Sequence, residues 1–162
     1  MTTQSIIAAE DNLTIRKLRQ QFLDDIVEAS TFRDEHTVWI RPSALIPICR
    51  FLRDNEEMQY NFLMDVTSVD YQDQEERFAV VYHLYSLQYN RRLRLKVRVG
   101  GSPPYIDSVT PLWNSANWSE REVYDLMGIH FRGHPDLRRI LLPDDWEGHP
   151  LRKDYPLKGP ES

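Results

Sequence analysis

Apolar and basic residues alternate strictly between positions 91 and 99. A period of two is typical of a strand that turns one face toward a core. The preceding segment, residues 78–87, is almost continuously apolar, which indicates a strand buried on both faces in the interior of a sheet. Only residues 88–90 separate the two segments, so the pattern predicts an antiparallel hairpin.

The other strand candidates are short segments rich in β-branched and aromatic residues. Residues 28–32 and 36–41 flank a turn at 33–35, and residues 62–69 form a third candidate. Residues 106–109 fit either an edge strand or a loop.

Three segments have the apolar spacing of amphipathic helices. Asn12 is a suitable cap for the first, and Pro42 suits the first turn of the second. The third begins either at Thr110, which precedes a proline, or at a capping box that opens with Ser119. Gly128 ends it.

This order of elements predicts an α+β fold, a two-layer sandwich with a mixed sheet of about five strands, helices on one face and an extended C-terminal tail. We expect a disordered lead at residues 1–11, an α+β domain at 12–128 and a strap at 129–162 that contacts partner subunits. Residues 143–162 hold four prolines, so few backbone groups there can join a helix or a ladder.

Composition narrows the functional classes. A net charge of −5 argues against attraction of the whole chain to nucleic acid or anionic lipid. The single cysteine, Cys49, excludes an internal disulfide, and one thiolate cannot hold an iron–sulfur cluster, which needs about four. The chain has neither the features of a signal peptide nor an apolar run of about 18–20 residues, so we expect another subunit to hold it at any membrane.

The sequence from residue 120 onward resembles a family signature. It reads E-R-E-x-x-D, two apolar residues, six residues, His, three residues, Arg, any residue and two aliphatic residues. The matching residues are Glu120, Arg121, Glu122, Asp125, Leu126, Met127, His134, Arg138, Ile140 and Leu141. Residues 151–157 are similar to the segment that follows in the same family, so the match covers 38 of 162 residues. The family is the 30-kilodalton subunit of respiratory complex I, NADH:quinone oxidoreductase.

The resemblance implies a non-catalytic, cofactor-free subunit in the peripheral arm of a proton-translocating NADH:quinone oxidoreductase. NADH, flavin, iron–sulfur clusters and quinone would belong to the whole complex. The implied partners are the quinone-site subunit, which helps form the quinone cavity, and neighbouring iron–sulfur subunits. The implied location is the cytoplasmic side of the cell inner membrane, with membrane contact only through other subunits, and the implied role is to brace the quinone-site subunit.

We expect the charged and aromatic residues of this region to form a partner interface or a structural network. They are Glu120, Arg121, Glu122, Asp125, His134, Asp136, Arg138, Arg139, Trp146, Arg152, Asp154, Tyr155 and Leu157. One hypothesis joins Glu122 and Asp125 to Arg121, Arg138 and Arg139, so that the network pins the strap to the last helix. Glu120 interrupts an apolar helix stripe, for which we expect an arginine partner.

Other kinds of site fit the sequence less well. His130 and His134 are four residues apart, with Asp136 and His149 nearby, but Gly128, Gly133 and Pro135 prevent the continuous helix that a zinc pair would use. Hydrogen-bonding histidines are the simpler interpretation. A hydrolase that uses Glu120 and Glu122 would also need a substrate pocket, and the sequence gives no sign of one. Cys49 is expected to be a buried free thiol.

A nucleic-acid-binding module is the alternative function. Strand 91–98 carries Arg92, Arg94, Lys96 and Arg98 on one face, where they could follow a phosphate backbone. The net charge favours a solvated face instead, or one that meets an acidic neighbour.

Overall fold

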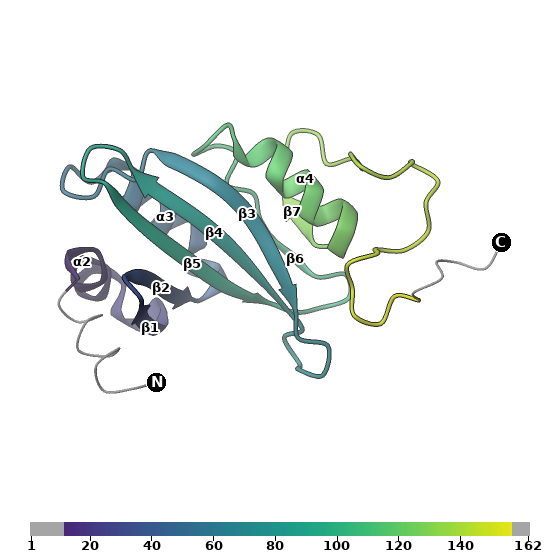
Figure 1. Ribbon diagram of the computed structural model, residues 1–162, viewed down its shortest axis with the longest axis horizontal. Helices are drawn as coiled ribbons and strands as arrows, with labels where there is room; N and C mark the ends of the chain where they lie inside the picture. Colours follow the sequence, from purple (N-terminus) through teal and green to yellow (C-terminus); the bar gives the residue numbers. More distant parts are fainter. Residues whose placement is uncertain (1–11, 157–162) are drawn as a thin grey trace.

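The computed structural model describes residues 12–156. The lead expected at residues 1–11 and the end of the strap, including Leu157, lie outside the described residues. The chain contains three helices, seven strands and two short 3₁₀ turns in the part that is described (Figure 1). They are α2 (Leu13–Phe22), β1 (Ile26–Phe32), β2 (Glu35–Ile40), α3 (Leu45–Asp54), β3 (Phe62–Asp70), β4 (Phe78–Ser86), β5 (Arg91–Val99), β6 (Tyr105–Asp107), α4 (Ala116–Met127) and β7 (His130–Arg132), with turns at Leu23–Asp25 and Pro42–Ala44.

Five strands form one mixed sheet in the order β1-β2-β5-β4-β3. Strands β2 and β5 are parallel, and the other neighbours are antiparallel. The predicted hairpin of β4 and β5 is confirmed, with Phe78 opposite Val99 and Ser86 opposite Arg91. The predicted α+β class is therefore confirmed, with helices on one face of a five-stranded sheet.

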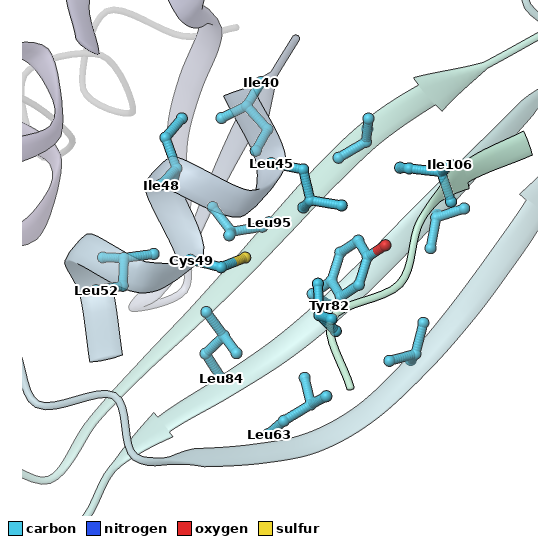
Figure 2. Close-up of a cluster of buried hydrophobic side chains, with 14 of the residues drawn as sticks. Ile40, Leu45, Ile48, Cys49, Leu52, Leu63, Tyr82, Leu84, Leu95 and Ile106 are labelled. Atoms are coloured by element: carbon cyan, nitrogen blue, oxygen red, sulfur yellow. The ribbon is translucent and has the colours of Figure 1, made fainter. Parts of the chain in front are cut away.

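The helices bury their apolar side chains against one face of this sheet. Helix α3 contributes Ile48, Cys49 and Leu52, which lie close to Tyr82 and Leu84 of β4 (Figure 2). Cys49 is a buried free thiol, as expected, and burial raises its pKa above the ordinary value for a thiol. The outer face of β4 is also largely buried, which explains why its sequence is apolar at nearly every position.

Helix α4 begins at Ala116 and not at either start that the sequence suggests. Thr110 lies in a turn, and Ser119 lies inside the helix. Tertiary hydrogen bonds fix the start: the Trp113 indole donates to the Tyr60 carbonyl at 3.2 Å, and the Ser115 hydroxyl donates to the Leu63 carbonyl at 2.9 Å. These bonds reach more than fifty residues back along the chain, so local capping patterns could not reveal them.

A second sheet joins the strap to the domain. Strand β7 pairs in parallel with β6, and Ile106 lies opposite Phe131 with both side chains buried. The sequence pattern predicts no regular structure from residue 129 onward, and the pairing of β7 corrects that prediction. Three residues are too few to produce a periodic signal, so the pattern does not reveal this strand.

Within residues 12–156, no helix has both the length and the apolar character needed to cross a membrane.

Candidate functional site

Asp125, in the last turn of α4, is the centre of the contacts that hold the strap. Its side chain is fully buried. One carboxylate oxygen accepts from the Arg139 guanidinium at 2.8 Å. The other accepts from the backbone N–H groups of Ile140, Leu141 and Leu142 at 3.1, 2.8 and 3.0 Å. Burial alone would raise the pKa of Asp125, but these N–H donors and Arg139 outweigh it and hold the pKa below its ordinary value.

The strap also satisfies the open end of α4. The last carbonyls of a helix have no partner within the helix. Here the Asp125 carbonyl accepts from the His149 ring at 2.9 Å, and the Leu126 carbonyl accepts from the Leu151 N–H at 3.0 Å. The Met127 carbonyl accepts from the Arg152 guanidinium at 2.7 Å. Three successive carbonyls thus bind one short segment of the strap.

Gly128 allows this close approach. It caps α4 with a φ of 74°, in the left-handed region that favours glycine. A Cβ atom at this position would lie 2.5 Å from the His149 ring and 2.6 Å from the Arg152 guanidinium. Glycine at 128 is therefore required both by the backbone conformation and by the strap that packs against it.

A second anchor fixes the strap to the base of the β3–β4 hairpin. Asp70 is buried and makes a two-pronged ion pair with Arg77, with both N···O distances at 2.7 Å. The same carboxylate accepts from the Lys153 N–H at 2.8 Å, and Arg77 also binds Asp154 at 2.8 Å. Arg77 and the backbone donors lower the pKa of Asp70 to about 2.

A third set of contacts binds the start of the strap along α4. Arg121 donates to the carbonyls of Arg138 and Arg139, both at 3.2 Å. The His134 ring bonds to the Asn117 carbonyl at 2.9 Å and accepts from the Asp136 N–H at 2.9 Å. These bonds satisfy backbone groups of residues 136–139, which form no helix or strand. They explain how an irregular segment remains ordered here.

Glu120 is separate from these contacts and, within residues 12–156, does not have the arginine partner that the sequence predicts. It is fully buried, and its carboxylate accepts from the Ser108 hydroxyl at 2.6 Å and the Val109 N–H at 2.7 Å. Burial raises the pKa of Glu120 to about 7, although the two hydrogen bonds oppose the rise. Two uncharged donors are enough to stabilise this buried group, because a carboxyl group with this pKa can remain protonated, and therefore uncharged, at neutral pH.

The proposed network is smaller than the sequence suggests. Glu122 accepts from the Trp118 indole at 3.2 Å and does not bind an arginine within residues 12–156. Arg138 pairs with Asp136 at 2.7 Å, and both are exposed. Trp146 is exposed, whereas the Tyr155 ring packs against Gly148, where a Cβ would lie 2.8 Å from it.

Sequence reasoning missed several residues of this site. They are Asp70, Arg77 and Ser108. For His149 the sequence favours a hydrogen-bonding histidine over a metal ligand, and its ring bonds to the Asp125 carbonyl. Asp70 and Lys153 are 83 positions apart, so no local pattern links them. In the described part of the chain, no group of three or more His, Cys, Asp or Glu side chains could hold a metal ion.

Known proteins resemble this chain over most of its length. The model of a family described as "Respiratory-chain NADH dehydrogenase, 30 Kd subunit" matches residues 38–161. An NADH-quinone oxidoreductase subunit of Geobacter sulfurreducens is 55% identical over 154 residues, which are 94% of each chain. The protein of the same name from Geotalea uraniireducens is 52% identical over 153 residues, 94% of this chain and 92% of its own.

Two solved structures share the fold. A trypsin-resistant fragment (1–134) of Nqo5 is 35% identical with a TM-score of 0.64, and the match covers 75% of this chain and 97% of the fragment. A chain of the membrane-bound sulfane sulfur reductase, an archaeal respiratory membrane complex, has a TM-score of 0.76 at 20% identity. The match covers 88% of this chain and 84% of the reductase chain. At that identity the second likeness shows the fold alone.

Arg139→Ala tests the first anchor. It leaves the buried Asp125 carboxylate without its cationic partner, which typically costs roughly 3–5 kcal/mol. We expect a loss of that order in the free energy of unfolding, measured by denaturant titration of the full chain. Arg138→Ala is the control, because the neighbouring guanidinium is exposed and should leave stability unchanged. Equal stability of the two variants would contradict the assignment.

Gly128→Ala should loosen the strap. Gly133→Ala is its matched control, because Gly133 has a similar φ of 81° but no atom within 4 Å of a new Cβ. Both variants carry the same kind of backbone strain, and only the first displaces His149 and Arg152. Amide hydrogen exchange of residues 149–152 should rise in Gly128→Ala and stay near the wild-type rate in Gly133→Ala. Equal exchange in both would show that the contact is unimportant.

Glu120→Gln should change how stability depends on pH. The folded pKa is about 7 and the ordinary value is 4.5, so the folded state binds the proton more tightly than the unfolded state. The resulting stabilisation is fully present below pH 4.5 and is lost as pH rises through 7. Relative to the wild type, the variant should therefore gain roughly 3 kcal/mol between pH 4.5 and pH 8. A difference between the two proteins that does not vary with pH would rule out this role for Glu120.

Proposed function

The chain belongs to the family of the 30 kDa subunit of respiratory-chain NADH dehydrogenase and is a subunit of an NADH–quinone oxidoreductase complex, in which we propose that it acts as a brace. The strap would bind the quinone-site subunit, and the α+β domain would contact neighbouring iron–sulfur subunits. The chain itself would bind no cofactor and carry no active site.

The exposed apolar side chains of the strap region are the observation that carries this proposal. Leu141 is 57% exposed, Trp146 36% and Leu151 56%, and Trp118 of the adjacent helix is 58% exposed. The backbone of Leu141 is held by Asp125 and that of Leu151 by the Leu126 carbonyl, whereas the Trp146 N–H donates to the Pro143 carbonyl within the strap. Large apolar groups on a fixed backbone lose little conformational entropy when a partner covers them, which makes them suitable anchors for an interface.

Two residues of the family signature support the same surface. Glu122 and Arg138 match the signature but are not needed for the buried Asp125 cluster. Arg139, which occupies the unspecified position of the signature, supplies the buried ion pair instead. We expect a partner subunit to bind the side chains of Glu122 and Arg138.

The chemistry of the sequence supports the proposal that this chain holds no iron–sulfur cluster. Its one cysteine, Cys49, lies within the core, where burial raises the pKa and disfavours the thiolate form that binds metals. Electrons would therefore pass through cofactors in other subunits. The contribution of this chain would be to hold the distances between those subunits constant, at the cytoplasmic side of the cell inner membrane and without membrane contact of its own.

The solved relative supports the division between the domain at 12–128 and the strap at 129–162. The relative was crystallised as a trypsin-resistant fragment that ends at its residue 134. In this chain, by analogy, the α+β domain would be the resistant unit.

The double variant Trp146→Ala, Leu151→Ala tests the proposal. Losing two interface anchors should weaken binding by at least about 2 kcal/mol, or roughly 30-fold. We expect much less quinone-site subunit to be recovered with an affinity-tagged chain. Because both side chains are exposed, the stability of the free chain should stay within about 0.5 kcal/mol of the wild type.

Leu87→Ala is the matched control, since Leu87 is 71% exposed in the β4–β5 turn. It should leave recovery of the partner unchanged. Full recovery of the quinone-site subunit with the double variant would disprove the role of the strap.

A further inference from the structure

The main sheet has a second face that no described helix covers. Strand pairing places Trp39 beside Lys96, Ala79 beside Arg98 and Val81 beside Lys96 on this face. In Figure 1, helix α3 lies behind β4 and β5, so the open face is turned toward the reader. We call it the cation face, and its basic residues are Arg92, Arg94, Lys96 and Arg98 of β5.

The cations of this face are held in place by aromatic rings. The Lys96 ammonium and the Arg98 guanidinium each lie 5.1 Å from the centre of the Trp39 ring. Arg98 also lies 3.9 Å from the centre of the Tyr71 ring. Such stacking fixes long side chains that would otherwise be mobile, so a ligand that binds them incurs a smaller entropy cost.

Most of this charge has no carboxylate partner within the described chain. Arg94 pairs with Glu35 at 3.1 Å, but Arg92, Lys96 and Arg98 make no ion pair within residues 12–156. Burial is the main cause that lowers the pKa of Lys96, and the neighbouring charges of Arg94 and Arg98 lower it further. A neighbouring anion would relieve this repulsion.

We propose that the cation face is a second docking surface, distinct from the strap, and that it binds an acidic segment of a protein partner. The floor of the face favours a polypeptide, because it is partly apolar. Ala79 and Val81 are buried, Trp39 is partly exposed, and Phe62 and Val69 are exposed on the β3 edge. An acidic chain with apolar residues between its carboxylates matches both features.

Carboxylates at the edge of the cation face favour a protein partner over a nucleic acid or an anionic membrane. Glu35 and Asp65 are exposed, and together with His83, Arg92 and Arg94 they line a cleft of about 310 Å³ beside the cation row. These acids would repel phosphates of RNA or lipid. A protein partner can present a basic or neutral side chain at the same point, so mixed charge favours a protein.

Lys96 allows a direct test in the assembled complex. The purified complex and the free full-length chain are treated with acetic anhydride, and the acetylation rate of each lysine is followed by mass spectrometry. Lys96 should react at least tenfold more slowly in the complex. Lys17 of α2, which lies 3.4 Å from Glu57, is the comparison lysine. A carbodiimide, which joins amines only to adjacent carboxylates, should couple Lys96 to an Asp or Glu of another subunit.

Charge reversal supplies the second measurement. Arg92→Glu should lower the salt concentration at which the chain leaves the complex, whereas Arg16→Glu, the same charge change at an exposed position of α2, should not. Melting of the free variants checks that both fold. Because strap variants are not involved, a failure here leaves the proposed function intact, and a failure of the strap leaves this proposal intact.

Three outcomes would overturn the proposal. The first is equal acetylation of Lys96 in the complex and in the free chain. The second is protection of Lys96 that disappears on nuclease treatment, or that single-stranded RNA reproduces with the free chain. The third is protection by phosphatidylglycerol vesicles that is absent in the detergent-solubilised complex, which would assign the face to the membrane surface.

Discussion

The buried carboxylate of Asp125 determines how the chain after α4 is arranged. It lies at the end of a helix where the backbone carbonyls already carry partial negative charge, so its own charge is unfavourable there. Burial adds a further cost. Arg139 and the consecutive N–H groups of residues 140–142 offset both. The strap therefore supplies the partners of both the Asp125 carboxylate and the last carbonyls of α4.

The second anchor turns this local arrangement into a bridge. Asp70 belongs to the sheet, Asp125 belongs to α4, and the strap binds both. Asp70 accepts one backbone N–H group of the strap and Asp125 accepts three, and each carboxylate is paired with an arginine, Arg77 or Arg139. Two separate attachments limit how far the intervening segment can move, because release of one leaves the other in place. The strap thereby gains a fixed path beyond β7 without a further ladder.

Local patterns predicted the parts of the structure that depend on neighbours in sequence. Strict alternation at 91–99 and the short link at 88–90 specify the β4–β5 hairpin, and buried apolar runs specify the core. Long-range bonds decide the rest. Helix α4 starts where Trp113 and Ser115 bond to the carbonyls of Tyr60 and Leu63. Glu120 binds Ser108 and Val109 in place of an arginine. The acidic and basic composition of the strap indicated ion pairs, but their partners depend on tertiary folding.

The strap and the cation face differ in physical character, and this difference bears on assembly. The strap binds the rest of the chain through groups such as His149 and Arg152 and leaves Leu141, Trp146 and Leu151 exposed. Burial of apolar area gives binding that depends little on salt and dissociates slowly. The cation face carries a row of partly exposed basic side chains above its apolar groups, and such charge favours steering at long range and loses strength in salt. A chain with both surfaces can be oriented first by charge and then held by apolar contact. The order is set by range, because Coulomb forces act across roughly 10 Å of solution whereas apolar contact requires surfaces to meet.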